Sequence, residues 1–128
     1  MSGARSAGGG RPRAYRQRLG ERGEQLAADW YTRRGYEVVA RNWRCREGEL
    51  DLVVRRPGEL VFCEVKTRSS DRFGVPAEAV TARKQQRLRG LAARYLAAHG
   101  AGPRRRVTIR FDVAAVVGAR VEVIEAAF

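Results

Sequence analysis

The chain has 128 residues, the usual size of one domain, and 44% of them are hydrophobic, which excludes a wholly disordered basic tail. Its 26 basic and 14 acidic residues give a formal net charge of +12, which favours a polyanionic partner such as nucleic acid. Two cysteines without a C-x-x-C spacing and a single histidine exclude a zinc finger and a disulfide framework.

The basic residues are unevenly divided between arginine and lysine. Lys66 and Lys84 are the two lysines, and the other 24 basic residues are arginines. Each lysine therefore needs a reason that an arginine would not satisfy. The sequence also has neither a signal-peptide pattern near its start nor an apolar run of about 18 residues. We expect a cytoplasmic protein that makes no contact with a membrane.

The first 18 residues differ in composition from the rest. They contain five arginines, three consecutive glycines and no acidic residue. Such a segment cannot bury enough apolar area to fold alone, so residues 1–18 are predicted to be a flexible basic arm. Residues 19–128 are predicted to form a single domain.

The first half of this domain begins with apolar residues at spacings of three and four, which predict a helix from Leu19 to Arg34. Alternating residues then predict a short strand over 36–41. Two further strands, 50–54 and 60–67, read as a hairpin, because Pro57 and Gly58 form a turn between them.

The second half begins with a loop and a helix. Ser69 to Pro76 is polar and predicts a loop, and a helical pattern runs from about Thr81, the expected N-cap, to Ala98. Residues 107–117 and 121–124 are predicted to be the closing pair of strands. The predicted order is α-β-β-β-α-β-β, an α/β fold.

Charged residues interrupt the two apolar strands of the hairpin. A hairpin symmetric about its turn places Asp51 directly opposite Glu64, with Cβ atoms about 4.5 to 5.5 Å apart. Two facing carboxylates repel unless a proton or a cation lies between them. The alternation of side chains in a strand puts Lys66 on the same face as Glu64. Two carboxylates and one ammonium group should therefore converge on one patch.

This set of groups suits metal-assisted hydrolysis of phosphodiester bonds. Mg²⁺ prefers hard oxygen ligands and usually takes one or two protein carboxylates together with waters. Lys66 could orient the attacking water or neutralise developing negative charge, a task for which a compact ammonium suits better than a guanidinium. The alternative is an ordinary ion pair between Glu64 and Lys66, or between Asp51 and an arginine, on a solvated face.

Three segments in this region resemble the YraN-like family of the PD-(D/E)XK nuclease superfamily. They are GELDLV at residues 48–53, VFCEVKTR at 61–68 and FGVPAEAV at 73–80. The resemblance covers about residues 20 to 125. It implies a restriction-endonuclease-like αβββαβ core, with a mixed central sheet flanked by helices, similar to that of Holliday-junction resolvases.

The resemblance also implies roles for particular residues. Asp51 matches the aspartate of the motif, Glu64 and Lys66 match its (D/E)XK part, and Glu24 matches an acidic residue of the first helix. Leu50 stands where the motif's name has proline. Asp51, Glu64, Lys66 and Glu24 are therefore the expected catalytic residues, and Asp51 and Glu64 the expected ligands of Mg²⁺ or Mn²⁺.

Five basic residues are predicted to contact nucleic acid: Lys84, Arg83, Arg41, Arg44 and Arg68. Lys84 and Arg83 fall in the first turn of the second helix, where the helix dipole disfavours cations and the backbone N–H groups favour an anion. A solvated surface lysine is the alternative there. Arg41 and Arg44 belong to an arginine cluster that could line a groove for a phosphate backbone.

Two hypotheses of function follow. The first is a Mg²⁺-dependent endonuclease that acts on DNA, including branched or recombination intermediates. The second is a catalytically weak or inactive nucleic-acid-binding adaptor in DNA repair, recombination or RNA processing. DNA is favoured over RNA as the partner, and a homodimer would suit paired cuts in two strands.

Overall fold

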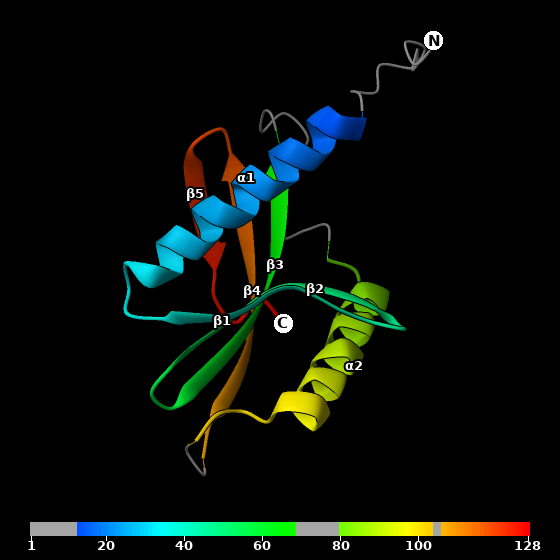
Figure 1. Ribbon diagram of the computed structural model, residues 1–128, viewed down its shortest axis with the longest axis vertical. Coiled ribbons are helices and arrows are strands. Elements are labelled where there is room, and N and C mark those ends of the chain that lie inside the picture. Colours follow the sequence, from blue (N-terminus) through cyan, green and yellow to red (C-terminus); the bar gives the residue numbers. More distant parts are fainter. Residues whose placement is uncertain (1–12, 69–79, 104–105) are drawn as a thin grey trace.

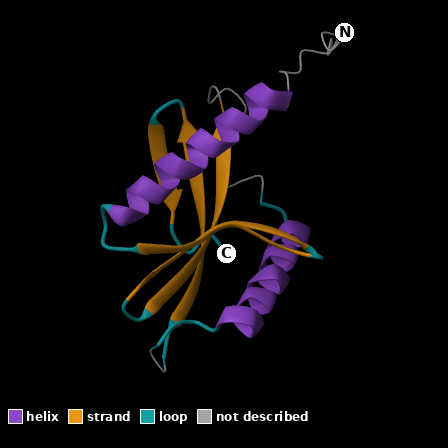
Figure 2. Cartoon of the chain, viewed as in Figure 1, coloured by secondary structure: helices purple, strands orange, loops and turns teal. Residues whose placement is uncertain are grey.

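A computed structural model describes residues 13–68, 80–103 and 106–128 of the chain. Two helices and five strands follow one another in the predicted order (Figures 1 and 2). Their bounds are α1 (Arg13–Thr32), β1 (Glu37–Cys45), β2 (Gly48–Arg56), β3 (Glu59–Arg68), α2 (Ala82–His99), β4 (Thr108–Val117) and β5 (Arg120–Ile124). The predicted loop over 69–76 and the predicted arm up to residue 12 lie outside the described residues.

The five strands form one mixed sheet in the order β1-β2-β3-β4-β5. β3 and β4 are parallel, and the other neighbours are antiparallel. A parallel pair needs a crossover connection, and α2 lies in that connection. The α/β fold is thus confirmed, and it is consistent with the restriction-endonuclease-like architecture that the motifs implied.

The two helices cover opposite faces of the sheet. α1 buries Gly23, Ala27, Ala28 and Tyr31, of which the last three belong to a core cluster with Leu52. Glycine and alanine at this contact let the helix approach closely, and a Cβ atom at Gly23 would collide with the side chain of Thr67. α2 packs its own apolar stripe on the other face.

The stripe of α2 consists of leucine, alanine and tyrosine at helical spacing. These residues are Leu88, Leu91, Ala92 and Tyr95, and they pack in one cluster with Val53, Leu60 and Phe62 of the central strands. Within the described residues, neither helix combines the length and the apolar character that crossing a bilayer requires.

The register of the β2–β3 hairpin agrees with the predicted symmetry, because Leu52 pairs with Cys63 and Val54 with Val61. The described ladder between β2 and β3 stops at the Leu52–Cys63 pair, whereas β3 and β4 stay paired as far as Arg68. The two strands of the hairpin thus separate at Asp51 and Glu64. Figure 1 shows β1 and β2 bending away from β3 toward α2.

Two element boundaries differ from the predictions by more than two residues. α1 begins at Arg13 rather than Leu19, so residues 13–18 are helical. The expected strand over 36–41 continues to Cys45, where it turns directly into β2. Residues 13–18 are largely exposed and polar, so they lack the apolar periodicity from which a helix is predicted. The end of β1 alternates exposed Asn42 and Arg44 with the partly buried Trp43 and Cys45, a pattern that the predicted bounds left out.

Candidate active site

Asp51 lies where β2 separates from β3. Its Oδ2 atom accepts a hydrogen bond of 2.9 Å from the backbone N–H of Val65. The described β2–β3 ladder has ended by this point, so the carboxylate satisfies a donor on β3 that no β2 carbonyl pairs with there. The fork of the two strands thus fixes the position of the carboxyl group and turns it toward β3.

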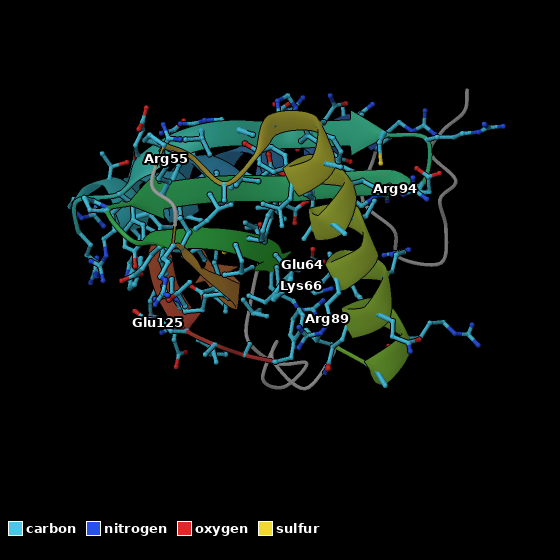
Figure 3. The ribbon with its side chains drawn as sticks, turned by 90° about the horizontal axis from the view of Figure 1, so that it is seen from below. Arg55, Glu64, Lys66, Arg89, Arg94 and Glu125 are labelled. Carbon is cyan, nitrogen blue, oxygen red and sulfur yellow. The ribbon has the colours of Figure 1, made fainter. Side chains whose placement is uncertain are left out.

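Glu64 lies on β3 and points toward α2 together with Lys66 (Figure 3). Its Oε2 atom is 3.6 Å from the Lys66 Nζ atom and 2.6 Å from the Lys84 Nζ atom. The Glu64 side chain is 12% exposed, and the two lysine side chains are 20% and 22% exposed. Both lysines of the chain therefore meet at one sheltered carboxylate oxygen.

The two carboxyl groups repel each other, as predicted, although Asp51 and Glu64 lie beyond the last pair of the described β2–β3 ladder. Burial first, and then the negative charge of Glu64, raise the pKa of Asp51 to about 7. The two side chains are close enough to share a hydrogen bond when Asp51 is protonated. Glu24 lies farther off and adds a smaller contribution to the same rise in the pKa of Asp51.

The lysines respond to this environment in opposite directions. Burial, followed by the hydrogen bond and the charge of Lys84, lowers the pKa of Lys66. Burial alone would also lower the pKa of Lys84, but its hydrogen bond to Glu64 raises that pKa above the ordinary value. Lys84 is thus the firmly charged partner of Glu64.

Glu24 on α1 approaches the site from the side of β1. Its Oε1 atom accepts a hydrogen bond of 3.0 Å from the Asn42 side-chain amide. Burial raises the pKa of Glu24 and the bond from Asn42 lowers it, while the charge of Glu49 raises it further; the overall shift is upward. Asn42 adopts a left-handed backbone conformation with φ of 49°. Asn42 was not predicted to belong to the site.

The donor set suits a hard divalent cation. Among the described residues, no group of three or more Asp, Glu, His or Cys side chains is arranged to hold a metal ion. Asp51 and Glu64, however, supply the one or two carboxylates that Mg²⁺ takes when waters complete its coordination. Burial and the negative charge of Glu64 raise the pKa of Asp51, so Asp51 holds a proton more readily than a solvated aspartate does. These two residues fit Mg²⁺ or Mn²⁺.

The other predicted nucleic-acid contacts surround this site without joining it. Arg41 donates a hydrogen bond of 2.8 Å to the Gln25 side chain, and Arg44 lies 3.6 Å from Glu49 across β1 and β2. Arg83 is exposed in the first turn of α2. The Nε atom of Arg68 is buried and has no hydrogen-bond partner among the residues that the structure describes.

Sequence reasoning missed a second buried carboxylate, Asp112 on β4, whose side chain is fully buried. Arg110 holds both of its oxygens, at 2.8 and 2.9 Å, and the Tyr31 hydroxyl donates a hydrogen bond of 2.6 Å. The backbone N–H of Ala126 donates another bond, of 3.0 Å. The sequence pattern that could have identified Asp112 is the one that identified Asp51, namely a charged residue inside an apolar strand. Because its partners are within the protein, Asp112 ties α1 to the sheet.

A cavity lined by residues around the β2–β3 turn lies at the opposite end of these strands from the two carboxylates. It has a volume of about 320 Å³ and surrounds the turn at Pro57. Its two arginines are already paired, Arg55 with Glu37 at 3.1 Å and Arg56 with Glu59 at 3.2 Å. The candidate site therefore stays at the fork between β2 and β3, where Asp51 and Glu64 lie.

Comparison with known proteins identifies a family whose match covers most of the chain. A family model described as "Uncharacterised protein family UPF0102" matches residues 23–116. A UPF0102 protein of Frankia alni is 55% identical over 98 residues, which are 77% of this chain and 79% of the relative. A UPF0102 protein of Beutenbergia cavernae is 56% identical over 102 residues, or 80% and 84% of the two chains. One from Acidothermus cellulolyticus is 45% identical over 125 residues, or 88% and 95%.

The family match includes every residue of the candidate site, from Glu24 on α1 to Lys84 on α2. It confirms the resemblance carried by the segments around Asp51 and Glu64. The chain belongs to the UPF0102, or YraN-like, family of the restriction-endonuclease-like superfamily.

Proposed function

We propose that this protein is an endonuclease that uses Mg²⁺ or Mn²⁺ to hydrolyse phosphodiester bonds in DNA. The observation that carries this proposal is the meeting of Asp51, Glu64 and Lys66 at the fork between β2 and β3. Burial and the charge of Glu64 raise the pKa of Asp51 to about 7, so the site favours an added positive charge. Metal-dependent cleavage of a polyanion would make use of this preference.

Each residue of the site has a defined role in this proposal. Asp51 and Glu64 would hold the ion, which would polarise the scissile phosphate and lower the pKa of a bound water. Lys66 would stabilise the negative charge that develops on the phosphate oxygens when water attacks phosphorus and the bond to the leaving oxygen breaks. Glu24, held by Asn42, would be an accessory acid at the edge of the site.

The surroundings would hold the DNA backbone. Arg41, Arg44 and Arg83 are exposed near the site, and Arg68 lies two residues beyond Lys66 on β3. Contacts of this kind bind phosphates without reading the base sequence. We propose DNA in preference to RNA, and a homodimer and a cytoplasmic location stay predictions from the sequence.

Cleavage assays on labelled DNA test the proposal. The full chain should cut branched, single-stranded or double-stranded DNA when Mg²⁺ or Mn²⁺ is present and should stop when EDTA is added. Asp51→Asn should lower the rate by a factor on the order of 100 or more, because it removes a charged ligand. Glu47→Gln removes one carboxylate in the β1–β2 turn, where it pairs with Arg94 at 3.2 Å, and should leave the rate unchanged.

One observation favours the second candidate function, a nucleic-acid-binding adaptor without turnover. The ammonium group of Lys84 already lies against Glu64, where a metal ion would bind. If the protein binds branched or single-stranded DNA with a steep salt dependence, yet shows no metal-dependent cleavage that Asp51→Asn removes, the nuclease proposal is wrong and the adaptor takes its place.

A further inference from the structure

We propose that Lys84 is a built-in competitor of the metal ion, because its ammonium group and a divalent cation would both bind the Glu64 carboxylate and repel each other there. This inference rests on the proposed function, since it assumes that the ion binds Asp51 and Glu64. It goes further by assigning Lys84 a regulatory position within the site, in addition to the phosphate contact predicted from the sequence.

The contact geometry is the first support. Lys84 Nζ is 2.6 Å from Glu64 Oε2, whereas Lys66 Nζ is 3.6 Å from the same atom. Mg²⁺ binds carboxylate oxygens at about 2.0 to 2.1 Å and tolerates little distortion. An ammonium group at hydrogen-bond distance from that oxygen would face the ion across a very short gap. Like charges repel at such a distance, so each of them weakens the binding of the other to Glu64.

The position of Lys84 on α2 is the second support. Its backbone N–H donates a 3.2 Å bond to the Thr81 side chain, which places the residue in the first turn of the helix. The helix dipole disfavours a cation there, so helix stability does not explain the lysine. Glu64 does explain it, because an anion faces the helix start. The sequence had suggested a phosphate for that anion.

The identity of the residue is the third support. A lysine head is a compact point charge on a flexible four-carbon stem, so it can swing away from Glu64 while the helix stays in place. The Lys84 side chain is 22% exposed, which leaves it a path toward solvent. Once released, the ammonium group would lie at the mouth of the site, where it could meet a DNA phosphate.

The reciprocity of coupled binding gives the expected size of the effect. If Lys84 and the ion exclude each other, removing the ammonium group must strengthen ion binding. Lys84→Met keeps a chain of similar length without the charge. We expect the full-length variant to bind Mn²⁺ about 5- to 100-fold more tightly than the wild type in a calorimetric titration.

Arg87→Met is the matched control. Arg87 is exposed one turn further along α2, and its charge acts on Lys84 without being part of the Glu64 pair. Its removal takes away the same unit of charge from the same helix. It should change the affinity for Mn²⁺ far less than Lys84→Met does.

A measurement on the unmodified protein avoids any effect of the variants on folding. The chain has two lysines, so a ¹⁵N-lysine sample should give two ammonium signals in a proton–nitrogen spectrum. The spectrum of Lys84→Met should lack one of the two signals, which assigns that signal to Lys84. Added Mg²⁺ should move the Lys84 signal toward that of a solvated lysine, and should move it further than the Lys66 signal.

The outcomes separate this inference from the proposed function. If Mn²⁺ binds the wild type, Asp51→Asn abolishes binding, but Lys84→Met leaves the affinity unchanged or weaker, the competition is wrong and the metal site stands. If neither the wild type nor Lys84→Met binds Mn²⁺, both proposals fail. Binding that is seen in Lys84→Met and absent from the wild type would be the strongest support for the competition.

Discussion

At the scale of single residues, the unusual feature of this molecule is Asp51, a largely buried carboxyl group. It accepts a hydrogen bond from the backbone and lies close to a second acidic side chain, that of Glu64. Asp51 accepts the Val65 N–H at 2.9 Å, which favours its charged form. Burial and Glu64 act in the opposite direction and prevail, because the pKa rises to about 7. Without an added cation, ionised Asp51 therefore destabilises the folded protein.

This balance predicts how stability depends on pH. The pKa of Asp51 rises from its ordinary value of 3.8 to about 7 on folding, so its contribution is complete at low pH and is lost as the pH rises through 7. In Asp51→Asn the amide can still accept from Val65 and can donate to Glu64, as a protonated acid would. We expect the variant to be roughly 1 to 3 kcal/mol more stable than the wild type at pH 8.

Urea unfolding in EDTA between pH 4.5 and 8 measures this difference. The gap between the two proteins should close toward the acid end, where wild-type Asp51 is protonated. A variant that is less stable than the wild type at pH 8 would show that Asp51 is ionised without cost, and would remove the argument for a cation between the carboxylates.

The contacts that could be predicted from the sequence and those that could not differ in how far apart the two partners lie along the chain. Asp51 and Glu64 are joined by one short turn, so the symmetry of the turn predicted their meeting. The contact of Lys84 with Glu64 depends on how α2 packs against the sheet, which no local pattern specifies. Tyr31 and Asp112 are 81 positions apart, and their pairing depends on the same kind of packing.

At the scale of elements, the packing of α1 on β3 positions the acidic side of the site. Gly23 contacts Thr67 directly, and Glu24 follows it on the helix. Thr67 in turn follows Lys66 on β3. The close contact that Gly23 allows between α1 and β3 thus determines how near Glu24 comes to the fork between β2 and β3.

A methyl group added to this contact should therefore be costly. Gly23→Ala places a Cβ atom in collision with the Thr67 side chain, so the helix or the strand must shift. We expect a loss of about 1 to 3 kcal/mol in the free energy of unfolding, as for other overpacked cores. Thermal or urea denaturation measures it.

A second substitution distinguishes overpacking from a general effect on the helix. Thr67→Ala removes the hydroxyl and methyl groups that the new Cβ would meet, so the double variant should recover part of the lost stability. Alanine is the better helix former, so a stable Gly23→Ala variant would mean that the contact with Thr67 is loose.

At the scale of the whole molecule, the positive charge and the acidic site would serve the same proposed function. The formal charge of +12 would bring a polyanion to the surface, and the exposed arginines of β1 lie on the side of the sheet where β2 separates from β3. The composition predicted that the protein attracts a polyanion. It did not predict where the polyanion lies on the surface, because the arginines are spread along the whole sequence. For the proposed DNA contact, the fold suggests β1 as the place, since β1 is an edge of the sheet next to the strand of Asp51.

The last prediction concerns where the DNA backbone lies. Each neutralised phosphate contributes roughly 0.7 to 0.9 to the slope of log affinity against log salt. Arg41→Gln combined with Arg44→Gln should therefore lower that slope by roughly 1.4 to 1.8 and weaken binding equally for all DNA sequences. Fluorescence anisotropy at several salt concentrations, in EDTA to prevent cleavage, measures it.

The control removes the same charge from elsewhere on the surface. Arg33 follows α1, and Arg120 begins β5, at the edge of the sheet opposite β1. If DNA lies across β1 and the start of α2, Arg33→Gln with Arg120→Gln should change the slope much less. Equal effects of the two pairs would mean that DNA binds without a preferred face, and the fork between β2 and β3 would then not be the place where the backbone is held. A larger effect of the control pair would place the DNA away from Arg41 and Arg44, and the proposed position of the backbone would be wrong.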